Sequence, residues 1–273
     1  MRYSPAFVTT LMLLSAPAAA QISGRADLSV GGRYVWHGVS RAGGLVAQPS
    51  LALGLRVRAV SLEGGAVFHC ELDRVSPGEL TETGSGGSCR GEHDFWGRAT
   101  LTLGPARLRT GLVRYVFLDP ARSTTEVYAG FTMTGRYTQT YEAWWDVDRV
   151  RGAFLRASVD LPVLAWPFPP AAFVFVEGDV GLNVGQGPNA ARPSDLANFA
   201  ARGVTHVGLG AGAEVRAGRL GSIGWATLGA GVRSQINLDE ATRGDGVGRN
   251  RDFLVWLWTG MTVVLGGDAR SLR

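Results

Sequence analysis

The sequence predicts an all-β fold: an antiparallel transmembrane β-barrel of about 12 strands that follows a cleaved signal peptide. Three observations support this prediction. They are an export signal at the N-terminus, a period-two alternation of apolar and polar residues, and links between strands that are alternately short and long. We therefore divide the chain into a signal peptide, residues 1–20, and one barrel domain, residues 21–273.

The first twenty residues have the layout of a secretory signal. Arg2 gives a positive start, residues 7–14 (FVTTLMLL) form a short apolar run, and residues 17–20 (PAAA) end in an A-x-A pattern. The apolar run is shorter than the ~20 residues that a membrane-spanning helix needs. We therefore expect export to the outer membrane of a Gram-negative cell.

Composition agrees with a barrel that has one apolar and one polar face. The chain contains 39 glycines, only 18% of its residues are charged, and its mean hydropathy is +0.07. Beyond the leader, no apolar stretch is long enough for a transmembrane helix. The net charge is +4, and every basic residue is an arginine. Because these arginines are scattered singly, we expect no nucleic-acid partner.

The period-two rhythm recurs along the whole chain. Leu51, Leu53, Leu55 and Val57, for example, alternate with polar or small residues, as in a strand with one apolar face. Segments of this kind are about as long as a tilted strand that crosses a bilayer. We predict strands at 25–39, 49–58, 60–71, 93–104, 106–117, 124–134, 136–147, 152–162, 171–183, 203–216, 221–237 and 251–265.

The predicted links alternate in length, as the links of outer-membrane barrels do. Short links fall at 59–60, 104–105, 135–136 and 217–219. Long links rich in Gly, Pro, Asp, Asn and Ser fall at 40–48, 72–92, 184–202 and 238–250. Aromatic residues near the strand ends predict two interfacial girdles. These residues are Tyr34, Trp36, Phe68, Phe95, Tyr115, Phe117, Trp145, Phe253 and Trp256 on the loop side, with Trp166 and Phe168 on the turn side.

The polar face of each strand predicts a lumen of mixed charge. We expect the lumen to be lined by Arg33, His37, Arg56, Arg58, Glu63, Asp94, Arg98, Arg107, Arg109, Glu142, Arg156, Asp160, Glu177, Asp179, His206, Glu214, Arg216 and Arg233. The same face carries His69, Glu126 and Asp146. Because unpaired charges are costly in a narrow tube, many of these side chains should pair across strands. Loose pairing would leave a water-filled pore, whereas tight pairing would seal the barrel.

Cys70 and Cys89 are the only cysteines, and in an oxidising compartment we expect them to form a disulfide. A metal site that also uses His69 and His93 is the alternative. No C-x-x-C or H-x-x-x-H spacing supports that alternative, so we expect no metal and no cofactor.

Three functions fit these patterns. The first is a porin-like channel for the passive passage of small polar solutes. The second is a sealed structural or adhesive barrel that binds partners through its outer loops. The third is a soluble periplasmic carrier of lipocalin type. An enzyme is disfavoured because none of the four histidines lies near a G-x-S-x-G motif. Besides solutes, the expected partners are outer-membrane lipid and the barrel-assembly machinery; the oligomeric state is left open.

Residues 28–41 (LSVGGRYVWHGVSR) resemble the opening strand of the TorF family of porin-like proteins, which has the form V-S-x-Y-x-x-R-G-V-S-Q. His37 stands where an Arg is usual in this pattern, and Arg41 stands where a Gln is usual. The segment 48–51 (QPSL) is similar to the start of the family's next strand. The resemblance covers about 25 residues. It implies an outer-membrane barrel of porin type, with no established substrate and no catalytic residues to carry over.

Overall fold

The computed structural model of the chain describes residues 20–42, 44–72, 89, 92–117, 120, 123–166, 171–186, 199–220, 224–243 and 252–266. The predicted signal peptide lies outside the described residues except for Ala20. Among the described residues, no helix is long and apolar enough to cross a membrane.

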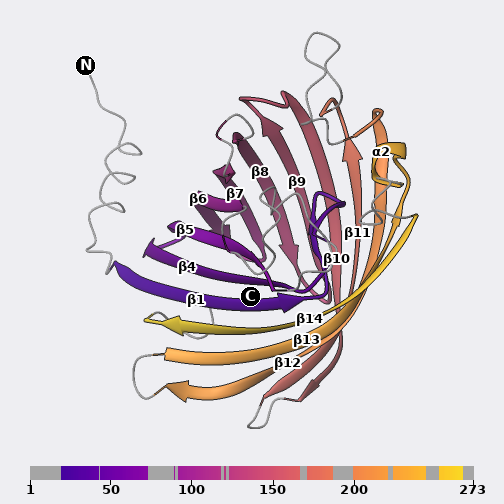
Figure 1. The fold of residues 1–273 in the computed structure, drawn as a ribbon. Helices are drawn as coiled ribbons and strands as arrows, with labels where there is room; N and C mark the ends of the chain where they lie inside the picture. The colour runs from indigo at the N-terminus through magenta and orange to yellow at the C-terminus, as the bar shows by residue number, and fades with distance from the viewer. Residues whose placement is uncertain are drawn as a thin grey trace, which may run out of the picture.

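The strands confirm the predicted fold class, because 12 of them close into one antiparallel barrel (Figure 1). Each strand pairs with its neighbours along the chain, and β1 closes the ring by pairing with β4 on one side and β14 on the other. The barrel strands are β1 (Gln21–Gly31), β4 (Val46–Val57), β5 (Val60–Glu71), β6 (Glu92–Leu103), β7 (Ala106–Phe117), β8 (Thr124–Thr134), β9 (Thr138–Asp146), β10 (Gly152–Trp166), β11 (Ala172–Asn183), β12 (Gly203–Leu220), β13 (Gly224–Asn237) and β14 (Phe253–Leu265).

Alternation decides which side of the wall each side chain occupies. Leu53 and Leu257 point outward and are 73% and 70% exposed. On the same strands, Arg56 and Trp256 line the interior. Successive side chains of a strand point to opposite faces, so the period-two pattern gives the barrel an apolar outside and a largely polar inside.

The predicted first strand, 25–39, is wrong at its C-terminal end. β1 ends at Gly31, and the chain then forms a separate two-stranded sheet of β2 (Tyr34–Trp36) and β3 (Val39–Ala42). His37 and Gly38 form the turn of this hairpin with positive φ angles of 47° and 86°. The hairpin lies within the ring of strands (Figure 1), because side chains from several parts of the wall contact it. We call residues 34–42 the inserted hairpin.

The remaining strand boundaries agree with the prediction to within a few residues. The largest differences are at β10, which continues to Trp166 through a register shift between Pro162 and Leu164, and at β12, which continues to Leu220 through one between Arg216 and Gly218. A bulge leaves an extra residue unpaired and tolerates a proline that cannot donate to the ladder. The segment before β14 contains one short helix, α2 (Glu240–Arg243).

The aromatic girdle is only partly as predicted. Phe95, Trp145, Phe253 and Trp166 are exposed on the outer face, as expected. The predictions for Tyr34, Trp36, Tyr115 and Trp256 are wrong, since these side chains lie inside the barrel. Phe168 lies outside the described residues. Tyr34 and Trp36 lie inside because their segment is part of the inserted hairpin and not of a wall strand.

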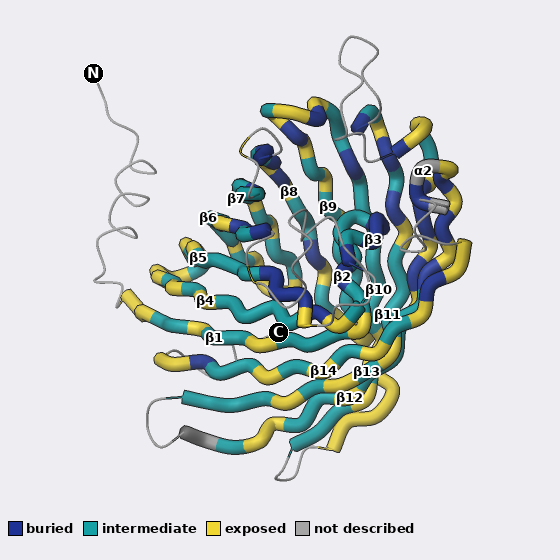
Figure 2. Tube along the Cα trace, in the orientation of Figure 1, coloured by how far each residue is buried: buried dark blue, intermediate teal, exposed yellow. Residues whose placement is uncertain are grey.

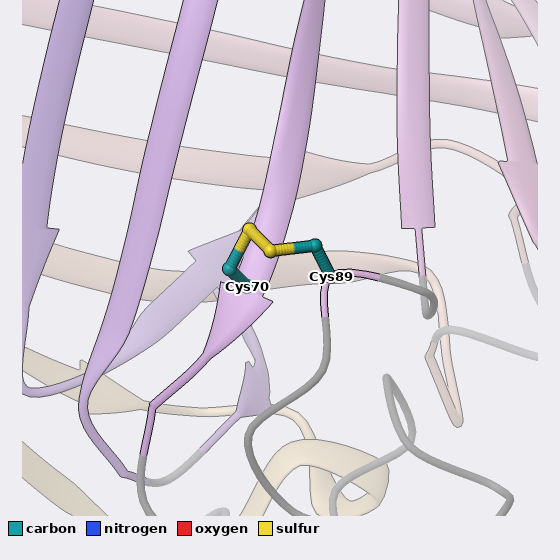
Figure 3. Close-up of a disulfide and its surroundings, with 2 residues drawn as sticks. All are labelled: Cys70 and Cys89. Carbon is teal, nitrogen blue, oxygen red and sulfur yellow. A yellow bond between two sulfur atoms is a disulfide. The ribbon is translucent and has the colours of Figure 1, made fainter.

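The barrel has two halves with different interiors. The turn half contains the strand ends that short links join, such as β4 to β5 and β6 to β7; the loop half contains the opposite ends. Nearly all buried residues lie in the loop half, where Figure 2 shows dark blue around β2, β3 and the strand ends beside α2. The disulfide between Cys70 and Cys89 confirms its prediction and lies at the loop end of β5 (Figure 3).

Candidate functional site: the lumen and the inserted hairpin

The turn half encloses a cavity of about 1450 Å³. It extends from the short turns to the base of the inserted hairpin, where Arg33, Tyr34 and Val35 contribute to its lining. Of the residues predicted for the lumen, the cavity is lined by Arg33, Arg56, Glu63, Arg98, Arg107, Arg109, Asp160, Glu177, Glu214, Arg216 and Arg233.

The other predicted lumen residues occupy three different places. Glu142, Arg156 and Asp179 form ion pairs in the interior. His37, Asp94 and His206 are packed in the loop half, with His37 on the inserted hairpin instead of on a wall strand. Arg58 lies in the turn between β4 and β5, where it is exposed and has a φ of 55°, and it is not part of the cavity lining.

Ion pairs join the interior charges across strands. Arg98 pairs with Glu63 on the adjacent strand, with Nε 3.1 Å from Oε2. Arg156 lies 3.3 Å from Asp179, and Arg233 lies 2.6 Å from Glu177. Their side chains remain between 13% and 34% exposed. The charges are therefore partly solvated, and their pairing does not fill the turn half.

The charges are unevenly distributed around the cavity. Arg56, Arg98, Arg107 and Arg109 lie on the wall of β4 to β7 with one acid, Glu63, whereas Asp160, Glu177 and Asp179 lie on β10 and β11 with one arginine, Arg156. Among the described residues, Arg107 forms no ion pair and donates to the Thr134 hydroxyl at 3.3 Å. An arginine-rich wall that faces acidic strands produces an electric field across the lumen.

The inserted hairpin contacts the barrel wall around most of its circumference. The Tyr34 hydroxyl donates to Glu92 on β6 at 3.1 Å, and Trp36 packs edge-on against Tyr115 on β7. At the hairpin tip, the Gln235 amide on β13 donates to the Gly38 carbonyl at 2.6 Å. The hairpin therefore crosses the lumen in the loop half.

Burial of Tyr34 favours its hydrogen bond to Glu92, because it keeps the Tyr34 hydroxyl protonated. Desolvation raises the pKa of the Tyr34 hydroxyl well above its ordinary value, and the nearby Glu92 and Asp94 raise it further. The hydroxyl therefore stays protonated and available as a donor to Glu92.

Glu126 on β8 is the central acceptor of the loop half. Its carboxylate is fully buried and contacts His37 at 3.1 Å, the Tyr115 hydroxyl at 2.8 Å and the Gln186 amide at 2.7 Å. One residue thus joins the hairpin, the wall and the link that follows β11. A buried carboxylate requires such partners, because an unpaired buried charge is strongly destabilising.

Gly38 allows the hairpin tip to approach the wall closely. Its φ is +86°, and a Cβ placed there would overlap the imidazole ring of His206. Only glycine combines this backbone conformation with so little space. His37 stacks on Phe154 with ring centroids 4.3 Å apart, and Val39 belongs to the same apolar cluster as Phe154 and Phe199.

Thr205, His206 and Asp179 form a chain of hydrogen bonds in the order hydroxyl, imidazole, carboxylate, which is also the order of a catalytic triad. The Thr205 hydroxyl lies 3.0 Å from His206 Nδ1, and His206 Nε2 lies 3.1 Å from Asp179. Thr205 is 1% exposed and His206 is 3% exposed. The geometry therefore gives a substrate no access to the hydroxyl, and the chain serves to hold His206 against the hairpin.

The sequence analysis did not predict the inserted hairpin, its ring contact with Phe154, or the bond from Gln186 to the Glu126 carboxylate that the hairpin also contacts. The signals that could have found it are the glycine pair Gly31-Gly32 and the His37-Gly38 step, both of which are turn signals within a predicted strand. The apolar residues between these turn signals fit a wall strand equally well. The period-two pattern therefore did not indicate that β1 ends at Gly31.

No family model and no curated protein matches the chain. Searches of solved structures return porins and other outer-membrane barrels. An outer-membrane channel from Pseudomonas putida F1 is 12% identical, with 93% of this chain and 97% of that chain covered and a TM-score of 0.45. The NanC porin is 7% identical (88% and 98% covered, TM-score 0.45). The KdgM porin, solved with disordered oligogalacturonate, is 6% identical (90% and 99% covered, TM-score 0.43).

Proposed function

We propose that this chain is a porin-type channel of the Gram-negative outer membrane, through which small polar solutes pass passively. The observation that carries the proposal is a closed barrel with an apolar outside and a charged, partly solvated cavity inside. Export through the signal peptide at 1–20 and insertion by the barrel-assembly machinery belong to the same proposal, as does membership of the TorF family.

The outer face supports contact with lipid. Large apolar side chains such as Leu51, Leu209 and Val255 are exposed along the strands. A soluble carrier would hide such a surface, because contiguous apolar patches of this extent are rare on monomeric soluble proteins. The closed ring also leaves no strand edge unpaired, which a bilayer requires. These features favour a membrane channel over a lipocalin-like carrier.

The inserted hairpin would set the narrowest part of the channel. In the turn half, the cavity of about 1450 Å³ has room for water and small solutes. In the loop half, Tyr34, His37 and Gly38 make hydrogen bonds or ring contacts with different parts of the wall. Solutes would therefore pass between the hairpin and the wall. Selection by charge would occur below it, where the arginine wall faces the acidic strands.

A sealed structural or adhesive barrel is the second candidate, and the same hairpin favours it, because a hairpin held this firmly could close the lumen completely. We propose no catalytic role, since the Thr205–His206–Asp179 chain is inaccessible to a substrate. The two candidates differ in one measurable property, the conductance of the folded protein.

Conductance of the purified protein in planar bilayers tests the proposal. The wild type should show small stepwise currents. A variant with residues 34–42 replaced by a Gly-Ser linker should show steps several-fold larger. Arg98→Glu and Arg109→Glu each change the lumen charge by two units and should shift ion selectivity toward cations by about twofold to fourfold at low salt. Thr125→Glu, on the outward face of β8, is the charge control and should leave selectivity unchanged.

Heat-modifiable migration on a gel establishes that each variant is folded before its currents are compared. Folded wild type that never conducts, together with a hairpin-replaced variant that does, would support the sealed barrel. Absence of conductance from both would reject the channel. Recovery of the wild-type protein from cells without detergent would reject the membrane barrel itself.

A further inference from the structure

Three potential metal ligands meet on the interior wall beside the inserted hairpin. His69 on β5 is paired in register with Glu92 on β6, and Asp94 lies two residues further along β6 on the same face. One ligand atom from each residue can be chosen so that all three atoms lie within 4.8 Å of one another. Sequence spacing gave no sign of this arrangement, because the long link between β5 and β6 separates His69 from the two acids.

The cluster is buried and its hydrogen bonding is incomplete. His69 is 3% exposed, Glu92 is 2% exposed and Asp94 is 8% exposed. Glu92 Oε1 accepts from the Tyr34 hydroxyl, but Glu92 Oε2 has no hydrogen-bond partner among the described residues. Asp94 Oδ2 contacts His69 Nε2 at 2.9 Å, whereas Asp94 Oδ1 has no described partner. Buried carboxylate oxygens without partners are rare and costly, so they indicate a missing ligand.

The charge balance of the cluster favours a cation. Arg41 and Glu126 are the other charged groups that act on Glu92 or Asp94, and Tyr34 is neutral. Arg41 also lies over the Trp36 ring at 4.9 Å. With both acids deprotonated, as metal ligation requires, two carboxylates and one guanidinium leave a net negative charge even without Glu126. A divalent cation would compensate this charge in a place that water hardly reaches.

We propose that His69, Glu92 and Asp94 bind a divalent transition-metal cation of the Zn²⁺ class. One imidazole nitrogen with two carboxylate oxygens is a ligand set that Zn²⁺ accepts. Gln48 lies 2.9 Å from His69 Nδ1 and is itself contacted by the Ser29 hydroxyl at 3.3 Å. The contacting atom is the Gln48 amide nitrogen, so ligation of the cation by Nε2 requires the Gln48 amide to turn its oxygen toward a protonated Nδ1. That hydrogen bond would orient the metal-binding imidazole.

The cation would also stabilise the inserted hairpin. Tyr34 stacks on the His69 ring with centroids 4.1 Å apart and donates to Glu92. Ligation would therefore fix the two wall residues on which the base of the hairpin rests. This consequence does not depend on solute passage through the lumen, so a sealed barrel would bind the cation equally well.

Calorimetric titration of the metal-stripped, folded full-length protein with Zn²⁺ in detergent tests the proposal. One Zn²⁺ should bind per chain. His69→Gln, Glu92→Gln and Asp94→Asn should each weaken binding by at least about tenfold, since loss of even an outer-shell partner has an effect of that size. Two controls should leave the affinity unchanged. His93→Gln removes the imidazole between Glu92 and Asp94 on β6, and Asp148→Asn removes a carboxylate that pairs with Arg114 at 2.8 Å.

X-ray absorption of the Zn²⁺-loaded wild type keeps the test independent of how the variants fold. The first shell should contain only nitrogen and oxygen at about 2.0–2.1 Å. Failure of the folded wild type to bind Zn²⁺, a sulfur atom in the first shell, or equal weakening by His93→Gln and His69→Gln would each overturn the proposal. If Zn²⁺ binds as expected and conductance is absent, only the channel function fails.

Discussion

The turn half and the loop half of this barrel share a wall but differ in what fills it. In the turn half, ion pairs such as Arg233–Glu177 border a cavity of about 1450 Å³ and stay partly solvated. In the loop half, a buried carboxylate, Glu126, contacts three partners, and the inserted hairpin takes the place of solvent. Strand alternation builds the wall in both halves. The difference arises because one link was long enough to fold inward.

This comparison predicts different costs for removing a charge from each half. Glu126→Ala leaves His37, Tyr115 and Gln186 without their shared acceptor. Hydrogen bonds to charged groups contribute about 1.5–3 kcal/mol each, so we expect a loss of about 5 kcal/mol. Glu63→Ala removes a partly exposed pair and should cost less than about 1 kcal/mol. Urea-induced unfolding in lipid measures both, and equal losses would contradict the distinction between the halves.

Both halves are expected to share an apolar outer wall, and a pair of adjacent substitutions tests this. Leu53→Arg places a charge on the outward face near the middle of β4 and should destabilise the barrel in lipid by about 2–4 kcal/mol. Ala52→Arg places the same charge in the cavity and should cost much less. The measurement is the free energy of unfolding from vesicles. A larger loss of unfolding free energy for Ala52→Arg than for Leu53→Arg would show that the two faces of β4 have been assigned the wrong way round.

The disulfide belongs to the loop half and ties Cys70 on β5 to Cys89 in the link that leads to β6, so it should affect stability more than the lumen. Replacing Cys70 and Cys89 by serine releases a link with a sequence separation of 19. The chain-entropy relation gives a loss of about 3 kcal/mol for a loop of this size. Unfolding of oxidised and reduced protein measures this loss, and single-channel conductance should stay unchanged. A rise in conductance on reduction would show that this link supports the hairpin.

The smallest expected effect concerns the fit of the hairpin tip. Gly38→Ala introduces a Cβ against His206 at a φ of +86° and should cost about 2 kcal/mol from overpacking and backbone strain together. Gly104→Ala is the matched control, because Gly104 also has a positive φ but no atom lies within 4 Å of its Cβ position. Gly38→Ala should also raise conductance, whereas Gly104→Ala should not. Identical behaviour of the two variants would show that the tip does not press on the wall.

Much of the architecture could be predicted from the sequence because strand alternation is a local property. The apolar residues at 51, 53, 55 and 57 specify the outward face of β4 without knowledge of any neighbouring strand. Short links at 59–60 and 104–105 specify antiparallel neighbours, since so few residues cannot connect strands in any other way. The strand number, the closed fold and the disulfide followed from such local signals.

The position of the hairpin was decided by the tertiary structure. Tyr34, His37 and Gly38 find their partners at Glu92, Glu126 and Gln235, which are 58, 89 and 197 residues away in sequence. Local periodicity carries no information about contacts between residues so far apart in sequence. Residues 34–39 also alternate in polarity as a wall strand does. The same reason applies to the cluster of His69, Glu92 and Asp94, which exists only because β5 and β6 pair in one register. The sequence by itself determined the wall; the folded ring decided what lies inside it, because only closure brings distant side chains to face each other.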